Sequence, residues 1–238
     1  MSSNPALRRS SASFAAAATL LLVLLPAAAL ATDIALDFGS LPSAQGWTFV
    51  SGGSPVATEA QTFSLGSGVL TLNSMAFGFT GAGTSALYTH TGVVNNFEPI
   101  VITMRGRVIQ FEGDFTNSFV GGGFSFGFAQ GATYYMMGIS PTQIRNVNGV
   151  ILSSAYDNTQ FHDYRLEWTP PSSVRYYVDG TLISTNSASF GQVANRLTLG
   201  DGTGASNAHA EITQYRFLQG ASTGAKPSTW GRIKSLFR

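Results

Sequence analysis

Residues 161–185 read FHDYRLEWTPPSSVRYYVDGTLIST and contain the clearest strand pattern in the chain. Apolar and polar residues alternate over 164–168 and again over 174–178. Successive side chains of a strand point to opposite faces, so each segment is expected to turn one apolar face toward a core. The pair Asp179-Gly180 follows the second segment and tolerates the positive φ of a tight hairpin turn. The stretch therefore predicts paired antiparallel strands.

The rest of the body shows the same period of two. Residues 100–105 and 124–129 alternate strictly, and no stretch keeps a helical apolar stripe for three turns. Turn signals separate such runs at short intervals, for example Asn148-Gly149 and Asp201-Gly202. Roughly a dozen short strands at this spacing predict one all-β domain: a two-sheet antiparallel β-sandwich of jelly-roll type.

Composition excludes several kinds of site. The chain has 238 residues, of which 44% are hydrophobic and 11% charged, which argues against intrinsic disorder. With no cysteine, it has no disulfide framework, thiol nucleophile or cysteine-based metal site. Its three histidines (His90, His162 and His209) are far apart in sequence, so a histidine-rich metal centre is not expected. The chain also lacks a P-loop and the dinucleotide-binding Gly-x-Gly-x-x-Gly pattern.

Residues 1–31 are predicted to be a cleavable signal peptide. Arg8 and Arg9 precede an apolar run over 14–25, and Ala29-Leu30-Ala31 places small residues at a cleavage site. The alternative is a transmembrane anchor, but the run is shorter than the ~20 residues that span a bilayer, and Pro26 interrupts it. No other run is long enough to span a membrane. We therefore expect an exported protein (periplasmic, secreted or at the cell surface), with general secretion favoured over the twin-arginine route.

The charge distribution argues against nucleic-acid binding. Without residues 1–31 the chain has 11 basic and 12 acidic residues, and four of those bases lie after residue 225. The body over 32–225 then carries 7 bases and 12 acids, a net charge of −5. An acidic body without a basic stripe is a poor partner for a polyanion.

Candidate ligand-binding residues come from the strand faces. Ser125, Gly127 and Ala129 give one strand a face of very small residues, which suits either close packing of another element or a shallow ligand groove. Arg105 and Arg107 share a strand face and could hold an anionic or hydroxyl-rich ligand, although cross-strand ion pairs would serve equally well. The candidate ligand-binding residues are Arg105, Arg107, Tyr135 and Tyr177.

Two segments resemble a known superfamily. Residues 161–185 contain His162, Tyr164, Trp168-Thr169-Pro170 and, on the returning strand, Val178-Asp179-Gly180. They resemble the paired strands of concanavalin A-like lectins and glucanases, including laminin-G-like domains and the laminarinase/lichenase family of glycoside hydrolases. Residues 197–217 resemble the closing strands of laminin-G-like domains. The resemblance implies a concanavalin A-like sandwich, in which His162 is expected to be a hydrogen-bonded structural residue.

The enzymes of this superfamily carry Glu-x-Asp-x-x-Glu on one strand. A retaining glycosidase needs two carboxyl groups ~5 Å apart, one as nucleophile and one as acid/base. The nearest match here has Glu112 and Asp114, but Asn117 occupies the last position and cannot ionise. Gly113 and the following residues favour a loop, so Glu112 and Asp114 are interpreted as loop charges. The resemblance therefore leans away from catalysis.

Asp163 and Glu167 are a second acidic pair. They lie four residues apart on one predicted strand, so they share a face but are ~13 Å apart. Arg165 lies between them, as in a solvated charge ladder. Carboxylates from distant strands could still meet in the fold.

Calcium is a possible cofactor. The ion takes six to eight oxygen ligands, often from two or three acids with backbone carbonyls. Asp33 and Asp201 are the candidate ligands, with Asp37 and Glu211 nearby, because related sandwiches bring the two ends of the domain together. No EF-hand spacing supports this site.

The C-terminal residues change in composition. The domain is predicted to span 32–218, followed by a flexible linker over 219–229 and a short aromatic and basic tail over 230–238. The tail is either a frayed terminus, a segment that associates with an anionic membrane surface, or a tag read by sorting machinery.

Together these features predict an exported, non-catalytic laminin-G-like domain that binds a glycan or a cell-surface protein. One alternative is a divergent glycoside hydrolase acting on β-glucan-type polysaccharide. The other is a structural module of the cell surface or matrix.

Overall fold

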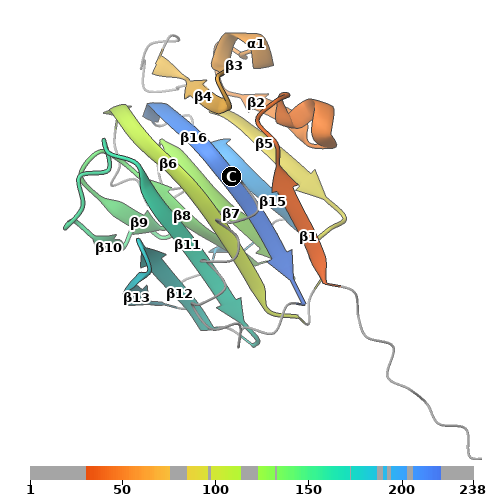
Figure 1. Cartoon of the computed structure of the whole chain (residues 1–238), viewed down its shortest axis with the longest axis vertical. Helices are drawn as coiled ribbons and strands as arrows, with labels where there is room; N and C mark the ends of the chain where they lie inside the picture. The colour runs from red at the N-terminus through yellow and green to blue at the C-terminus, as the bar shows by residue number, and fades with distance from the viewer. Residues whose placement is uncertain are drawn as a thin grey trace, which may run out of the picture.

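A computed structural model describes residues 31–75, 85–95, 98–113, 123–131, 133–171, 173–186, 190–191, 194–202 and 206–220. The described chain forms two stacked antiparallel sheets of eight strands each (Figure 1). This confirms the predicted all-β sandwich. Residues 1–30 of the predicted signal peptide, most of the predicted linker and the whole predicted tail lie outside the described residues.

The first sheet, sheet A, contains the longest strands. Its order is β13-β12-β11-β6-β16-β4-β3, and β1 also pairs with β16. The strand bounds are β1 (Thr32–Leu36), β3 (Phe63–Gly66), β4 (Val69–Asn73), β6 (Ile100–Gly113), β11 (His162–Thr169), β12 (Ser173–Val178), β13 (Thr181–Thr185) and β16 (Ser206–Gln219).

The second sheet, sheet B, lies behind it in Figure 1. Its order is β10-β9-β8-β7-β15-β5-β2, and β14 also pairs with β8. The strand bounds are β2 (Thr48–Gly52), β5 (Ser85–Thr91), β7 (Phe124–Gln130), β8 (Thr133–Ile139), β9 (Ile144–Asn146), β10 (Ile151–Ser153), β14 (Phe190–Gly191) and β15 (Arg196–Asp201).

Two short helices lie in connections near the start of the domain. They are the 3₁₀ helix η1 (Pro42–Gln45) and the single-turn helix α1 (Glu59–Thr62). A capping box between Thr58 and Gln61 satisfies backbone N–H groups at the start of α1, which explains why so short a turn forms there. In the described part of the chain no helix is both long enough and apolar enough to cross a membrane.

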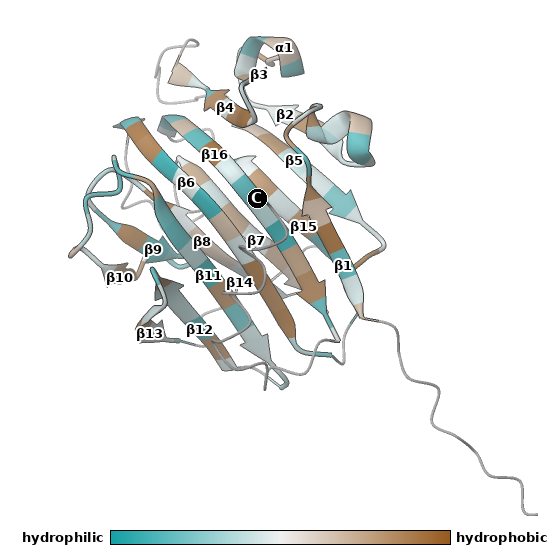
Figure 2. Ribbon diagram, viewed as in Figure 1, coloured by the Kyte–Doolittle hydropathy of each residue, from teal (hydrophilic) through white to brown (hydrophobic). Residues whose placement is uncertain are grey.

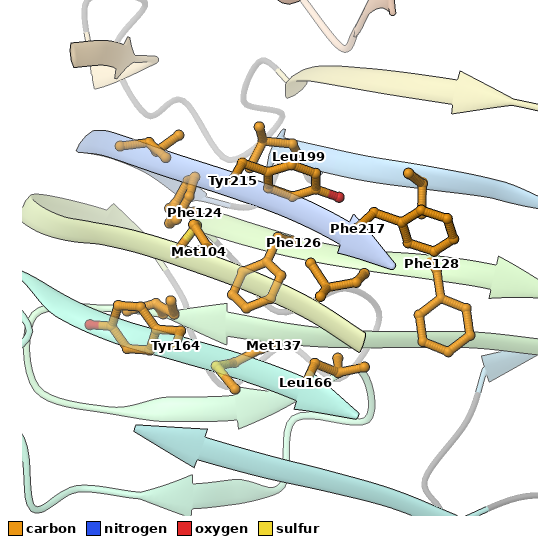
Figure 3. Packing of buried hydrophobic residues seen from close by; sticks show 14 of the residues in the cluster. Met104, Phe124, Phe126, Phe128, Met137, Tyr164, Leu166, Leu199, Tyr215 and Phe217 are labelled. Carbon is orange, nitrogen blue, oxygen red and sulfur yellow. The ribbon is translucent and has the colours of Figure 1, made fainter. Parts of the chain in front are cut away.

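The core lies between the sheets and follows the alternation seen in the sequence. Sheet B contributes Phe124, Phe126 and Phe128, all fully buried, and sheet A packs Leu166 and Phe217 against this layer (Figure 3). Brown and teal bands alternate along β6 and β16, because one face of each strand is apolar and the other polar (Figure 2).

The 161–185 stretch forms the predicted pair of strands. Tyr164 lies opposite Val178 and Trp168 opposite Val174 in an antiparallel register. Asp179 and Gly180 take positive φ angles of 50° and 81°, so the turn uses the two residue types that the sequence placed there.

The two ends of the domain meet in sheet A. Thr32 of β1 pairs with Gln219 of β16, so the first and last described strands are neighbours. Gln219 is fully buried and its side-chain amide donates to the carbonyl oxygen of Asn95 at 2.9 Å. The sandwich therefore includes Gln219, one residue beyond the predicted end of the domain.

Candidate functional site

The outer face of sheet A carries a row of ion pairs between neighbouring strands. Arg105 of β6 pairs with Asp163 of β11 at 3.1 Å, and Arg107 pairs with Glu211 of β16 at 2.8 Å. Both arginines lie on the same face because they are two residues apart on one strand. We call this set the charged ladder; its members are Arg105, Arg107, Asp163, Arg165, Glu167, Arg175, Glu211 and, at the β1 end, Asp33 with Arg216.

Glu167 is the centre of the ladder on β11. Its two carboxylate oxygens lie 3.3 Å from Arg165 and 3.1 Å from Arg175, and the Tyr177 hydroxyl donates to it at 3.1 Å. Burial and the negative charge of Glu167 raise the pKa of Tyr177, so the hydroxyl remains a donor. Asp163, Arg165 and Glu167 thus share one face, as the spacing predicted.

Two aromatic rings on this face are covered by guanidinium groups. The guanidinium carbon of Arg165 lies 3.9 Å from the centre of the Tyr177 ring, and that of Arg107 lies 4.7 Å from the centre of the Phe161 ring. Arg105 is also near Phe161, at 5.8 Å. Such cation–π contacts hold flat, donor-rich groups parallel to a surface. Three predicted ligand-binding residues (Arg105, Arg107 and Tyr177) therefore lie on one face. The two arginines are in cross-strand ion pairs, and Tyr177 donates a hydrogen bond to Glu167.

Tyr135, the fourth predicted residue, lies elsewhere. It is on the inner face of β8, is 5% exposed, and stacks obliquely on Phe128 with the ring centres 5.2 Å apart. It lines a small cleft at one end of the sandwich together with Gln130 and Trp168. The structure does not join it to the charged ladder.

The small-residue face of β7 is packed. Ser125, Gly127 and Ala129 are all buried on the outer side of sheet B. Tyr134 of β8 reaches across β7 to Thr198 of β15, where the two hydroxyls are 2.7 Å apart. The small residues therefore serve close packing, the first of the two roles that the sequence allowed.

Arg196 is a residue that the sequence analysis missed. It begins β15, is partly buried, and its Nε is buried without a hydrogen-bond partner. Among the described arginines it is the one without an ion pair or hydrogen bond. An isolated cation before the apolar run Leu197–Leu199, with no acid beside it in sequence, was the available signal.

Of the two acids in the incomplete Glu-x-Asp-x-x-Glu match, only Glu112 lies in the described part of the chain. Glu112 and Gly113 were predicted to lie in a loop, and this is wrong: both belong to β6, and Glu112 pairs with Asn207 of β16. The long partner strand β16 holds β6 extended to Gly113, which overrides the preference of glycine for turns. Asp114 and Asn117 lie outside the described residues.

The two predicted calcium ligands are far apart. Asp33 lies opposite Leu218 at one end of β16 and pairs with Arg216, with Nε 2.8 Å from the carboxylate. Asp201 is fully buried in sheet B and accepts a hydrogen bond from Ser74, which itself bonds to the backbone of Ala208. Ten residues of β16 separate the two positions, about 30 Å along a strand.

These acids therefore do not form one calcium site. Glu211 is ion-paired in the ladder, and Asp37 accepts a hydrogen bond from the backbone of Gly39 at 2.7 Å. Over the described ranges no three histidine or acidic side chains gather as a metal would require. The donor set does not fit a shared ion.

His162 is hydrogen-bonded on both sides. Its Nδ1 lies 2.7 Å from the Asp179 carboxylate and its Nε2 lies 3.1 Å from the backbone oxygen of Asp157. The Asp179 carboxylate also accepts the backbone N–H of Asp163 at 2.9 Å. Burial opposes the charge of Asp179, but these hydrogen bonds outweigh it and lower its pKa. His162 thus ties the start of β11 to the turn after β12.

Comparison with known proteins gives similarity in structure only. No protein-family model matches the chain, and no curated protein is similar to it in sequence. A β-1,3-1,4-glucanase (lichenase) derived from a mouse hindgut metagenome is 15% identical, covering 78% of this chain and 98% of that one, with a TM-score of 0.51.

Two further solved structures are similar to the same degree. The endo-β-1,3-glucanase from Pyrococcus furiosus is 15% identical over 78% of this chain and 92% of that one, with a TM-score of 0.50. A sialidase is 13% identical over 81% of this chain but only 18% of its own length, with a TM-score of 0.51. At such identities the likeness establishes the concanavalin A-like sandwich fold.

Proposed function

We propose that this chain is an exported, non-catalytic module that binds carbohydrate through the outer face of sheet A. The observation that carries the proposal is the charged ladder with its two arginine-covered rings. Guanidinium groups offer several donors in a fixed plane, and the paired carboxylates offer acceptors beside them. A hydroxyl-rich ligand needs such alternating donors and acceptors on an extended surface.

The state of the carboxylates supports binding without catalysis. A glycosidase needs two carboxyl groups that are free to attack or to transfer a proton. Within the described ranges every carboxylate except that of Glu112 accepts a hydrogen bond or an ion pair. Glu167 in particular already contacts two guanidinium groups and a phenol.

The similar structures favour the same ligand class. Two of them are named as enzymes of β-glucans, and the shared sandwich supplies a broad sheet face on which a chain of sugars can lie. The competing ligand is a protein of the cell surface, which a laminin-G-like domain could also bind. We favour the glycan because the ladder alternates donors and acceptors.

The place of action is inferred from the sequence. The signal-peptide pattern over 1–31 leads us to propose export, to the periplasm, the medium or the cell surface. The aromatic and basic tail over 230–238 is proposed to hold the module at a membrane surface or to be read by sorting machinery.

Polysaccharide pull-down and glycan arrays test the function, with reducing-sugar release measured in parallel. We expect binding without product release, and at least a tenfold loss of affinity in an Arg107→Ala, Arg165→Ala variant. Arg196→Met, in β15 of sheet B and outside the ladder, is the control and should bind normally. Sugar release that one acid-to-amide substitution abolishes would instead establish the divergent glycoside hydrolase. No binding across broad panels would favour the structural module.

A further inference from the structure

His162 lies directly behind one end of the charged ladder. It is the first residue of β11, and its side chain is 16% exposed. The ladder residue Asp163 follows it in the chain, and Phe161, whose ring is covered by Arg105 and Arg107, precedes it. Successive residues of an extended chain point to opposite sides, so His162 points away from the face on which its two neighbours lie. A side chain in this place can hold both neighbours without touching a ligand.

Both ring nitrogens of His162 face atoms that only accept hydrogen bonds. Nδ1 lies 2.7 Å from a carboxylate oxygen of Asp179, and Nε2 lies 3.1 Å from the backbone oxygen of Asp157. Burial opposes the charge of Asp179, but hydrogen bonds outweigh it and lower its pKa, so this group remains a carboxylate. A neutral imidazole has one N–H and can satisfy one of the two acceptors, whereas the imidazolium has two and satisfies both.

The groups around the ring are consistent with a second proton. The titratable and charged side chains that face it, or act on it through Asp179, are Tyr156 and Asp157 before β11, Tyr164 in β11, Asp179 after β12 and Arg105 in β6. Directly opposite on β6 is Gly106, which has no side chain. In the described part of the chain the ring thus contacts two aspartates and no cation.

We propose that His162 is a positioning residue of the charged ladder, and that its imidazolium form holds Phe161 and Asp163 so that carbohydrate binds more tightly in acid than in alkaline solution. The carboxylate of Asp179 also accepts the backbone N–H of Asp163 at 2.9 Å, and the Asp157 oxygen also accepts that of Gln160 at 3.1 Å. Both partners of the ring are therefore bonded to the backbone next to Phe161.

The direction of the pH effect follows from the number of protons on the ring. The form with two hydrogen bonds is present at low pH, and one of the bonds is lost as pH rises through the titration of the imidazole. The ring then no longer ties the turn before β11 to Asp179. This inference rests on the proposed function, because it concerns regulation of the same face.

The experiment measures binding of the full chain to a soluble β-glucan by calorimetry at about pH 5.5 and about pH 8.5. Imidazole groups titrate in this range, whereas carboxyl, guanidinium and phenol groups ordinarily do not. We expect binding to be about fivefold weaker at the higher pH, the effect of one lost hydrogen bond. NMR gives a second readout without glycan: the ring resonances of Phe161 should shift with the same pH midpoint as those of His162.

Asp179→Asn is the sharpest variant, because asparagine lets the neutral ring make both bonds. Its amide nitrogen can donate to Nδ1 while Nε2–H donates to Asp157, and its oxygen can still accept the Asp163 N–H. Binding should then be equal at the two pH values. His162→Gln does not titrate and should bind equally at both, at the weaker level of the unmodified chain at high pH. His90→Gln, in β5 of sheet B, is the matched control and should keep the fivefold difference.

The proposal is overturned if the unmodified chain binds β-glucan equally at both pH values, if Asp179→Asn keeps the difference, or if Phe161 does not follow the titration of His162. Binding without pH dependence leaves the proposed function intact and removes only the role of His162. If Phe161 follows His162 but no β-glucan binds at either pH, the positioning of Phe161 stands and the proposed function fails.

Discussion

For individual residues, the strength of each ion pair in the ladder depends on how deeply its carboxylate is buried. The Glu167 side chain is 11% exposed and faces two guanidinium groups, whereas the Asp163 side chain is 44% exposed and faces one. Solvent screens the second pair much more than the first. The two acids look equivalent in sequence, yet their energetic roles differ.

Glu167→Gln should lower the free energy of unfolding by about 1–3 kcal/mol, because it leaves Arg165 and Arg175 close together without their shared counter-charge. Asp163→Asn, the control on the same strand face, should cost less than about 1 kcal/mol. Urea unfolding measures both. Equal losses would show that burial does not set the strength of these pairs.

Stability at acid pH should depend on Asp33 and Asp179. Hydrogen bonds and the positive charge of Arg216 lower the pKa of Asp33. Burial opposes the charge of Asp179, but hydrogen bonds from Asp163 and His162 outweigh it and lower its pKa. A carboxyl group with a lowered folded-state pKa stabilises the fold above its unfolded pKa of about 3.9, and this is lost as pH falls through the folded value.

The variants Asp33→Asn and Asp179→Asn should therefore flatten the acid limb of the stability curve, measured by urea unfolding between about pH 5 and pH 2. Asparagine is suited to position 179, whose φ is +50°. Asp37→Asn, which removes a backbone-bonded but unpaired carboxylate, is the control. If the acid limb is unchanged in both variants, Asp33 and Asp179 are not the groups that make stability depend on acid pH.

The Arg196 side chain should lower the free energy of unfolding of the domain. A partly buried guanidinium without a counter-charge costs desolvation that nothing offsets. Arg196→Met keeps the aliphatic stem and removes the charge, so we expect the free energy of unfolding to rise by about 1 kcal/mol. Thermal melts followed by circular dichroism measure this change. A lower melting temperature would mean that the guanidinium has a stabilising contact.

Among the strands, β7 shows how a face of small residues allows side chains of the neighbouring strand to pack closely over it. A Cβ atom on Gly127 would lie 2.2 Å from the backbone oxygen of Tyr135, which no side chain can accommodate. The absence of a side chain there brings β8 close and lets Tyr134 cross to Thr198. The glycine is required by packing and not by a positive φ.

Gly127→Ala should therefore lower the free energy of unfolding by about 2–3 kcal/mol through a backbone clash. The control is Gly66→Ala in β3, where an added Cβ meets nothing within 4 Å. That substitution should change stability by less than about 1 kcal/mol, in either direction. Similar losses at the two positions would contradict the clash as the cause.

At the scale of the whole molecule, the sandwich is closed by segments from its two ends. β1 adds five residues to the side of β16 and buries Leu36, which is 7% exposed, while Asp33 pairs with Arg216. These contacts join positions more than 180 residues apart. Their formation requires most of the chain to be in place.

Removal of residues 32–36, compared with a chain that begins at Thr32, should cost about 3 kcal/mol from lost apolar burial and hydrogen bonds. For a domain of this size the melting temperature should fall by about 6–12 °C. Calorimetry provides the measurement. An unchanged melting temperature would show that β1 contributes nothing to the folded state.

The sequence alone determined the sandwich, its hairpin turns and most of its core faces, because alternation with a period of two is a local property of the chain. It also placed Asp163, Arg165 and Glu167 on one face, since strand geometry fixes spacing within an element. It failed at Glu112 and Gly113, where pairing with β16 outweighed local preference.

Which distant residues meet depends on the tertiary structure. Arg107 and Glu211 are brought together by the pairing of β6 with β16, and Tyr135 and Trp168 by the stacking of two sheets. The same topology separates Asp33 from Asp201 by the length of β16. Contacts of this kind depend on strand order and sheet stacking, which are set by the packing of the whole chain and leave no local pattern in the sequence.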